Sequence, residues 1–246
     1  MPEKMRRIVQ DFHLMDFAGC SLTMLDASLL LAFVERWHPK TSSFHLPFGE
    51  MTMTLDNVDV LFHIPIASTF FTPVYRDQGT VVRMVVDALE VDEVEVLSEF
   101  GDTRGFHLRM SWLRRIYQEL VHAERYQAAA RAYVLHLVAC TLFADKSGVY
   151  VDVHYLSLFS ALDTPCWAWG VAALTMLYAA LDAAYRPNTR QLAGYLSLLQ
   201  CWIHKHFPRI CEQKIQRVVA ADSCAERWKA QQAIPDDKQQ TRKPRH

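Results

Sequence analysis

Apolar and polar side chains alternate on both sides of one turn, and this pattern predicts a β-hairpin. Residues 44–46 and 51–54 place Phe, Leu or Met at every second position, with His or Thr in between. An alternation of period two is typical of strands that bury one face. Pro47 presets the backbone φ angle for a turn, and Gly49 can close it. We therefore expect a small β-hairpin near residues 43–53.

Segments with helical spacing of apolar residues flank this hairpin. Residues 23–37 have crowded apolar positions, and Thr23 and Asp26 stand three apart at their start. This spacing is typical of a capping box and predicts the beginning of a helix. After the hairpin, Thr54 can cap a second helix over residues 55–62.

The end of the first helix is expected to cover the hairpin. Trp37 stands directly before His38 and Pro39, where a helix has to end. We expect Trp37 to pack over the hairpin and Glu50 to pair with Arg36, so that the hairpin closes one side of the core.

The second half of the chain continues the helical pattern. Expected helices span residues 104–131, 131–144, 164–181 and 188–206, with a short extended piece at 149–153. Thr164, followed by Pro165, and Asn188, three residues before Gln191, are suitable caps for the last two helices. The predicted fold class is therefore mainly α, a single helical domain with one small β-hairpin.

Composition supports a helical globular protein and limits the chemistry. The chain has 246 residues, 51% hydrophobic and 22% charged, and a net charge of -1, so nothing in its overall charge favours nucleic acid. Its 8 glycines are few for a fold built on glycine-rich phosphate loops. The six cysteines form no C-x-x-C pair and are interpreted as reduced thiols.

Neither export nor a membrane span is expected. The N-terminal residues lack the apolar block of a secretory signal. Residues 164–181 form an uncharged run that just reaches the length needed to cross a bilayer. Its alanines and threonines, and the Asp182 that follows, favour a helix buried inside a bundle instead.

Charge is distributed in two opposed blocks. Residues 87–102 contain seven acids and no basic residue, whereas residues 104–131 contain six arginines and only two acids. Opposite charges on neighbouring segments suggest an internal ionic contact. Separately solvated faces are the commoner outcome for such segments, because exposed ion pairs contribute little to stability.

An ordered set of short motifs resembles the plant mobile domain family, also labelled aminotransferase-like. The matching positions are Glu35–Trp37, Phe44–Glu50, Thr54–Leu55, Pro65, Asp145–Gly148, Tyr155–Leu156, Trp169–Tyr178, Gly194–Trp202 and Phe207–Pro208. The family occurs in maintenance-of-meristems-like proteins, in long-form homologues of a plant serine/threonine phosphatase and in plant transposons. Two positions differ from the family's usual residues: Asn57 replaces aspartate and His63 replaces glycine.

The resemblance implies a domain organisation and a role. It covers residues 17–209, preceded by an N-terminal extension at 1–16. A C-terminal helix at 210–232 and a disordered basic tail at 233–246 are expected from the sequence pattern. The family implies a nuclear plant protein that acts through protein contacts in meristem maintenance, gene expression and transposon silencing. It implies a protein partner, with a phosphatase-like nuclear protein as the family's example, and no known active site.

The aminotransferase-like label finds no support in the residues. Pyridoxal chemistry needs a Schiff-base lysine and a phosphate cradle. Lys146 is the only lysine in a suitable turn, and the Ser and Gly beside it are ordinary turn residues. No phosphate-binding glycine motif is present. We expect no cofactor.

Metal binding and catalysis also lack a complete signature. Cys201, His204 and Cys211 offer three soft ligands, but a structural zinc site usually needs four with regular spacing. His136 lies in an apolar segment and is interpreted as a core histidine. Motifs such as G-x-S-x-G and S-x-x-K are absent, so we predict no catalytic, cofactor-binding or metal-binding residue. An enzyme that assembles Cys or Ser with a distant His remains the third hypothesis.

A nucleic-acid-associated domain derived from a transposon is the second hypothesis. Residues 204–217 carry four basic residues against one glutamate, and the C-terminal tail adds four more. A continuous basic stripe that joins this segment to the arginines of 104–131 would favour it. An exposed apolar patch would instead favour the leading hypothesis, a non-catalytic nuclear scaffold that binds protein. The sequence leaves the oligomeric state open.

Overall fold

The computed structural model describes residues 2–11, 14, 25–70, 76–103, 105–143, 149–159, 167–185 and 194–210. Within these residues the chain is mainly helical, as predicted. The helices are α1 (Glu3–Asp11), α3 (Ala27–Val34), α4 (Leu55–Phe62), α5 (Gln78–Leu89), α6 (Glu93–Thr103), α7 (Met110–His122), α8 (Tyr126–Cys140), α9 (Trp169–Ala184), α10 (Leu196–His206) and the 3-10 helix η1 (Val153–Phe159). The strands are β1 (Trp37–His38), β2 (Ser43–Leu46), β3 (Gly49–Met51), β4 (His107–Arg109) and β5 (Tyr150–Asp152).

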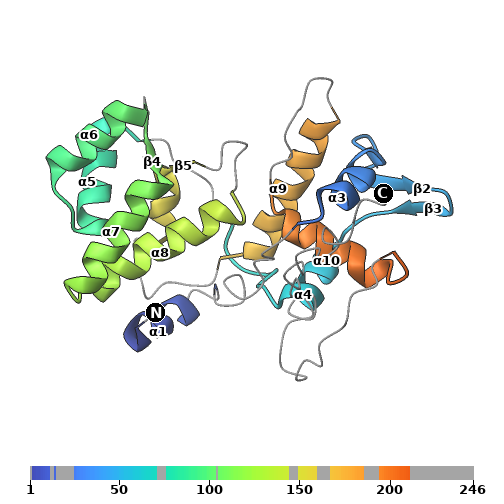
Figure 1. Cartoon of the computed structure of the whole chain (residues 1–246), viewed down its shortest axis with the longest axis horizontal. Helices are drawn as coiled ribbons and strands as arrows, with labels where there is room; N and C mark the ends of the chain where they lie inside the picture. Colours follow the sequence, from blue (N-terminus) through green and yellow to red (C-terminus); the bar gives the residue numbers. More distant parts are fainter. Residues whose placement is uncertain are drawn as a thin grey trace, which may run out of the picture.

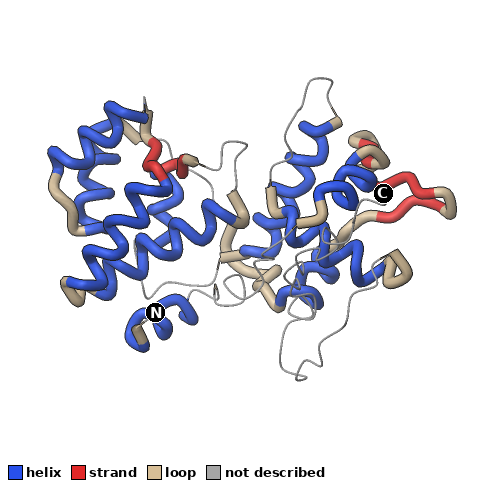
Figure 2. Tube along the Cα trace, in the orientation of Figure 1, coloured by secondary structure: helices blue, strands red, loops and turns tan. Residues whose placement is uncertain are grey.

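Two groups of elements lie side by side (Figure 1). The first, named here the four-helix lobe, contains α5 to α8 with β4, β5 and η1, and α1 packs against α8. The second, named here the hairpin lobe, contains α3, α4, α9 and α10 with β1 to β3. Strands are short and lie at the edges of both lobes (Figure 2). Helix packing, rather than a sheet, therefore builds the core.

The predicted hairpin is present and has an additional strand. Strand β2 pairs antiparallel with β3, with Phe44 opposite Met51 and Leu46 opposite Gly49. Gly49 has φ 137°, a conformation that suits glycine. On its other edge β2 pairs with β1, with Trp37 opposite Phe44. Trp37 thus belongs to the sheet, whereas the sequence pattern placed it inside the first helix.

Helix α4 forms over the predicted residues because both of its ends are specified locally. At its start, Thr54 and Asn57 form a reciprocal capping box, which satisfies two otherwise free amides. At its end, His63 adopts a left-handed conformation with φ 51° and ψ 36°. A residue with a Cβ atom is strained there by about 1 kcal/mol relative to glycine. Asn57 therefore preserves the cap, and His63 introduces strain.

Aromatic side chains fill the hairpin lobe. Trp37 and Trp202 both pack against Phe44, with ring centroids 5.0 and 5.4 Å apart. Phe33 meets Trp202 edge to face at 6.3 Å. The Trp37 indole nitrogen donates to Asp182 Oδ1 at 2.8 Å, so this large buried side chain has its polar atom satisfied. The expectation that Trp37 packs over the hairpin is confirmed.

The expected pair between Glu50 and Arg36 is wrong. Glu50 accepts a hydrogen bond from Ser43 Oγ at 3.0 Å and lies 3.5 Å from His45 Nε2. The Arg36 guanidinium donates instead to the carbonyl of Ala32 in helix α3, which ends just before it. Ser43 and His45 on the neighbouring strand are closer to Glu50 than Arg36 is, because cross-strand neighbours on one face of a sheet lie side by side.

Several helix starts differ from the predictions. Helix α3 begins at Ala27 and is capped by Asp26, whose side chain accepts from Leu29 N at 3.0 Å. Helices α9 and α10 begin at Trp169 and Leu196, later than expected. The predicted caps Thr23, Thr164 and Asn188 lie outside the described residues, as do the segments 211–232 and 233–246.

The arginine-rich segment is broken into more elements than expected. Strand β4 occupies its first described residues, and α7 and α8 are separated by a turn at Ala123–Arg125 in which Glu124 has φ 57°. The predicted extended piece is β5, which pairs antiparallel with β4.

No helix in the described part of the chain is both long enough and apolar enough to span a membrane.

Candidate functional site

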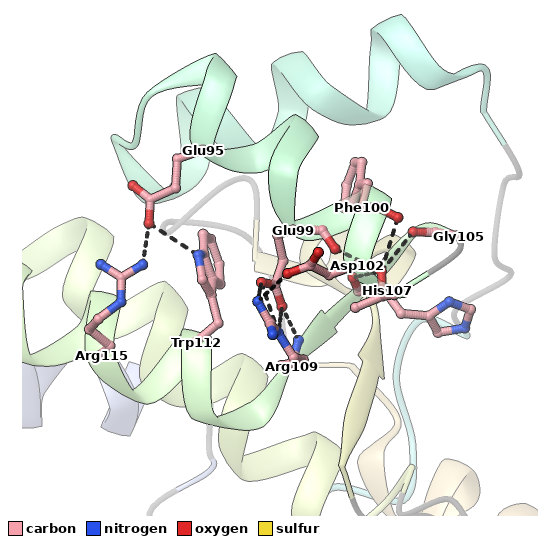
Figure 3. A network of polar contacts seen from close by, with 10 residues as sticks. Glu95, Glu99, Phe100, Asp102, Gly105, His107, Arg109, Trp112 and Arg115 are labelled. Carbon is pink, nitrogen blue, oxygen red and sulfur yellow. Dashed lines mark hydrogen bonds and ion pairs between the residues drawn. The ribbon is translucent and has the colours of Figure 1, made fainter.

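A polar network joins α6, β4 and α7 (Figure 3). Glu99 has a side chain only 1% exposed. One of its oxygens accepts from Arg109 N at 2.7 Å, and the other accepts from Arg109 Nη2 at 2.5 Å. Asp102 lies 3.0 Å from the same guanidinium. These contacts raise the pKa of Arg109, chiefly through its hydrogen bonds with Glu99.

A second branch of the network continues along α7. Glu95 accepts from the Trp112 indole nitrogen at 3.1 Å and pairs with Arg115. In a further ion pair, Glu90 lies 2.9 Å from Arg125. The acidic and basic blocks of the sequence therefore form the internal ionic contact that their charges suggested.

This network holds α6, β4 and α7 together. Every carboxylate named above already accepts from a guanidinium or an indole nitrogen. Thr103 Oγ1 lies 2.9 to 3.4 Å from four backbone carbonyl oxygens around the β4 turn. These contacts fix the turn between α6 and α7.

An apolar pocket lies where the two lobes meet, and we name it the interlobe pocket. Its volume is about 270 Å³. The four-helix lobe contributes Phe143, Tyr155 and Leu158, and the hairpin lobe contributes Phe70, Trp169 and Met176. Phe143 and Tyr155 stack with ring centroids 4.0 Å apart and planes at 4°. Aromatic walls on two separate lobes therefore enclose this space.

Backbone contacts fix the wall formed by α9. Thr69 forms a parallel bridge with Trp167, and Ala168 N donates to Thr69 O at 3.1 Å. The Trp167 indole nitrogen donates to Leu158 O at 3.0 Å and so links the two lobes. At Gly170, an added Cβ atom would lie 2.7 Å from Ile66. The close approach of the 65–70 segment to α9 therefore depends on this glycine.

The described lining of the interlobe pocket is mostly apolar. Its described walls include hydroxyl groups from Thr69, Tyr155 and Thr175, but no Cys, His, Asp, Glu or Lys side chain. Phe70 lines the pocket and is 70% exposed. An exposed large apolar side chain beside an aromatic pocket is typical of a site where a partner's side chain is buried.

Only two of the three candidate zinc ligands lie in the described structure. Cys201 and His204 are buried on α10, 0% and 4% exposed, and Cys211 lies outside the described residues. Across the described ranges, no group of three or more His, Cys, Asp or Glu side chains is arranged to hold a metal ion. Lys146, the lysine considered for pyridoxal chemistry, also lies outside the described residues.

One cysteine and histidine do lie in contact. His136 Nδ1 is 3.7 Å from Cys140 Sγ on the next turn of α8. Burial raises the pKa of the Cys140 thiol and lowers the pKa of His136, and the nearby Arg114 lowers the His136 pKa further. Both shifts favour the neutral thiol and the neutral imidazole. This pair therefore lacks the thiolate of an activated nucleophile.

Four of the described tryptophans belong to the core. They are Trp37, Trp112, Trp169 and Trp202, which are 2%, 6%, 1% and 0% exposed, and Trp228 lies outside the described residues. Trp167 is half-buried at the interlobe pocket. Sequence reasoning missed this pocket because its walls come from four separated segments. The aromatic pair Trp167 and Trp169, spaced two apart, was the one local signal.

Four described arginines of the 105–131 segment bind other groups of the protein. Arg109, Arg115 and Arg125 pair with carboxylates, and Arg131 donates to the carbonyls of Phe159 and Ala88. Helices α7 and α10 lie in different lobes (Figure 1). These four guanidinium groups are therefore engaged within the protein, whereas Lys214, Arg217 and the basic C-terminal tail lie outside the described residues.

The fold and the site together define a helical domain with an aromatic binding pocket. A family model described as plant mobile domain matches residues 12–246. The chain therefore belongs to the plant mobile domain family. No solved structure matches the chain significantly.

Curated relatives from Arabidopsis thaliana are longer than this chain. Protein MAIN-LIKE 1 is 35% identical over 74% of this chain and 36% of its own length. Protein MAINTENANCE OF MERISTEMS is 31% identical over 74% of this chain and 38% of its own length. A serine/threonine-protein phosphatase 7 long form homolog is 32% identical over 78% of this chain and 14% of its own length. The chain thus spans less than two fifths of each of these relatives.

Proposed function

We propose that this chain is a non-catalytic protein-interaction domain that buries an apolar side chain of a protein partner in the interlobe pocket. The observation that carries the proposal is the aromatic lining of that pocket beside the exposed Phe70. Burying one large side chain contributes about 2 kcal/mol to binding. The saturated polar network and the neutral pair of His136 and Cys140 support binding over catalysis.

We further propose that the domain acts in the nucleus, in meristem maintenance, gene expression and transposon silencing. One relative is named for the maintenance of meristems, which supports a role of this kind. Another is named as a phosphatase long form homolog, so a phosphatase-like nuclear protein is the partner to test first. A fluorescent fusion expressed in plant cells tests the location, and exclusion from the nucleus would contradict it.

The test of the pocket compares two exposed phenylalanines. Phe70 is 70% exposed at the pocket, and Phe48 is 69% exposed at the tip of the hairpin. Protein captured from Arabidopsis nuclear extract by the wild-type domain is identified by mass spectrometry. We expect Phe70→Ala to reduce capture of the main partner about tenfold, in line with the loss of an aromatic anchor, and Phe48→Ala to leave it unchanged.

Two additional comparisons make the result decisive. Thr175→Arg places a charge at an exposed position that lines the pocket, and Ala179→Arg places it one turn further along α9, outside the lining. Only Thr175→Arg should abolish capture, since a buried unpaired charge is costly. Nuclease treatment of the extract separates the alternatives. Capture that disappears with nuclease, or that survives Phe70→Ala and Thr175→Arg, would refute the proposal.

A further inference from the structure

A second pocket lies between α7 and α8, which run side by side in the four-helix lobe (Figure 1). We name it the arginine pocket. Its volume is about 290 Å³, close to the lower end of the range for small-molecule sites. The floor includes Leu113 and Ala132, which are buried. None of its described lining residues is shared with the interlobe pocket, so the two are separate sites.

Two tyrosines form an aromatic wall of the arginine pocket. The Tyr117 ring on α7 and the Tyr133 ring on α8 have centroids 6.0 Å apart with planes at 42°. Burial raises the pKa of Tyr133, so its hydroxyl stays protonated and can donate a hydrogen bond at neutral pH. A planar ring can pack against such tilted aromatic surfaces.

Arg114 supplies an uncompensated positive charge at this pocket. Four other described arginines of the same segment each donate to a carboxylate or to backbone carbonyls. Among the described residues, no carboxylate lies within 4.0 Å of Arg114, which lines the pocket from an exposed position. The charge of Arg114 acts on two neighbouring side chains. It lowers the pKa of His136, and it partly offsets the rise in the pKa of Cys140 that burial causes. The lining contains no acid that would neutralise this charge.

His136 offers an unused hydrogen-bonding atom at the same place. Its Nε2 atom is buried and has no partner among the described residues. Its other nitrogen lies 3.7 Å from Cys140 Sγ. Because the thiol remains protonated, it can donate to Nδ1, and Nε2 then carries the ring proton. A buried donor of this kind is stabilised when it meets an acceptor.

We propose that the arginine pocket binds a small aromatic carboxylate. The ring packs on Leu113, Tyr117 and Tyr133, the carboxylate pairs with the guanidinium of Arg114, and His136 Nε2 donates a hydrogen bond to one carboxylate oxygen. This occupant matches the volume, the apolar floor, the unpaired cation and the unsatisfied donor together. An anion without an aromatic ring would leave the apolar floor exposed to water, and an uncharged aromatic molecule would leave Arg114 unpaired.

The experiment titrates the purified full chain with phenylacetate by isothermal titration calorimetry and by NMR. We expect saturable binding with one site, and binding of phenylacetamide at least about tenfold weaker, because a charge-assisted hydrogen bond is lost. Inorganic phosphate serves as the anion without a ring and should not compete. No saturable binding of phenylacetate, or equal binding of phenylacetamide, would overturn the proposal.

Variants locate the site without disturbing the fold. Arg114→Gln removes an exposed charge and should weaken phenylacetate binding about tenfold. Arg83→Gln on α5 is the matched control, since Arg83 is also exposed and lies outside the pocket, and it should leave binding unchanged. Tyr133→Phe keeps the ring and removes the hydroxyl, so binding should persist. Loss of binding in Arg83→Gln, or unaltered binding in Arg114→Gln, would contradict the assignment.

Discussion

The two lobes of this domain are held together by different interactions. In the hairpin lobe, Trp202 is fully buried among the aromatic rings of Phe33, Phe44 and Phe207. In the four-helix lobe, a buried carboxylate and several guanidinium groups join α6 to α7. Apolar burial depends little on salt, whereas exposed ion pairs are screened. The lobes should therefore respond to different perturbations.

The largest effect is expected from Trp202→Ala in the hairpin lobe. Removing this fully buried indole leaves a cavity and should lower the free energy of unfolding by about 3–5 kcal/mol. Urea denaturation measures this change. Hydrogen exchange should show loss of protection in α3, α4 and α10 before α5 to α8. Trp202→Phe keeps a ring in place and serves as the milder control, and equal loss of protection in both lobes would contradict the comparison.

A smaller effect is expected from Glu99→Gln in the four-helix lobe. The neutral amide loses charge-assisted bonds at a buried position, which should destabilise the domain by about 2 kcal/mol. Protection should now fall first around α6, β4 and α7. Glu119→Gln is the control, because Glu119 forms an exposed pair with Arg115 on the same helix and should change stability by less than about 0.5 kcal/mol. Similar effects of both substitutions would show that burial of Glu99 is unimportant.

A gain of stability is expected from His63→Gly. The left-handed backbone at the end of α4 is strained for histidine, and glycine should relieve about 1 kcal/mol. Thermal or urea denaturation measures the gain. Glu90 has the same conformation, with φ 52°, at the end of α5, but it also pairs with Arg125. Glu90→Gly should therefore stabilise less than His63→Gly, and the reverse order would contradict this account.

Sequence reasoning succeeded where structure is specified locally. The hairpin follows from the alternation around Pro47 and Gly49, and α4 follows from Thr54 and the helical spacing after it. The strain at His63 follows from the glycine that related sequences usually have there. The opposed charges of the acidic and arginine-rich segments suggested a contact, but sequence reasoning favoured separately solvated faces, and it did not indicate the buried position of Glu99.

Features that depend on distant segments could not be predicted in this way. The strand at Trp37 exists because it pairs with β2, and the pairing of β4 with β5 joins residues about forty positions apart. Local helical spacing gave no sign that Trp167 would bridge to Thr69 before α9 begins. The interlobe pocket is invisible for the same reason. Nor does the sequence show which arginine remains unpaired.

The smallest expected effect concerns one buried histidine in each lobe. Burial lowers the pKa values of His136 in the four-helix lobe and of His204 in the hairpin lobe below the ordinary value of 6.5. In the unfolded chain both imidazoles bind protons more readily than in the folded domain. Their contribution to stability is therefore full above pH 6.5 and is lost as the pH falls below 6.5 toward the lower folded values.

Neighbouring charges should distinguish the two histidines in an NMR titration. Arg114 lowers the pKa of His136 further, whereas Asp26 partly offsets the lowering at His204. Arg114→Gln should raise the pKa of His136 and leave that of His204 unchanged. Asp26→Asn should lower the pKa of His204 and leave that of His136 unchanged. If either substitution moved both pKa values equally, the two lobes would share one electrostatic environment, and the difference between them would lie in packing only.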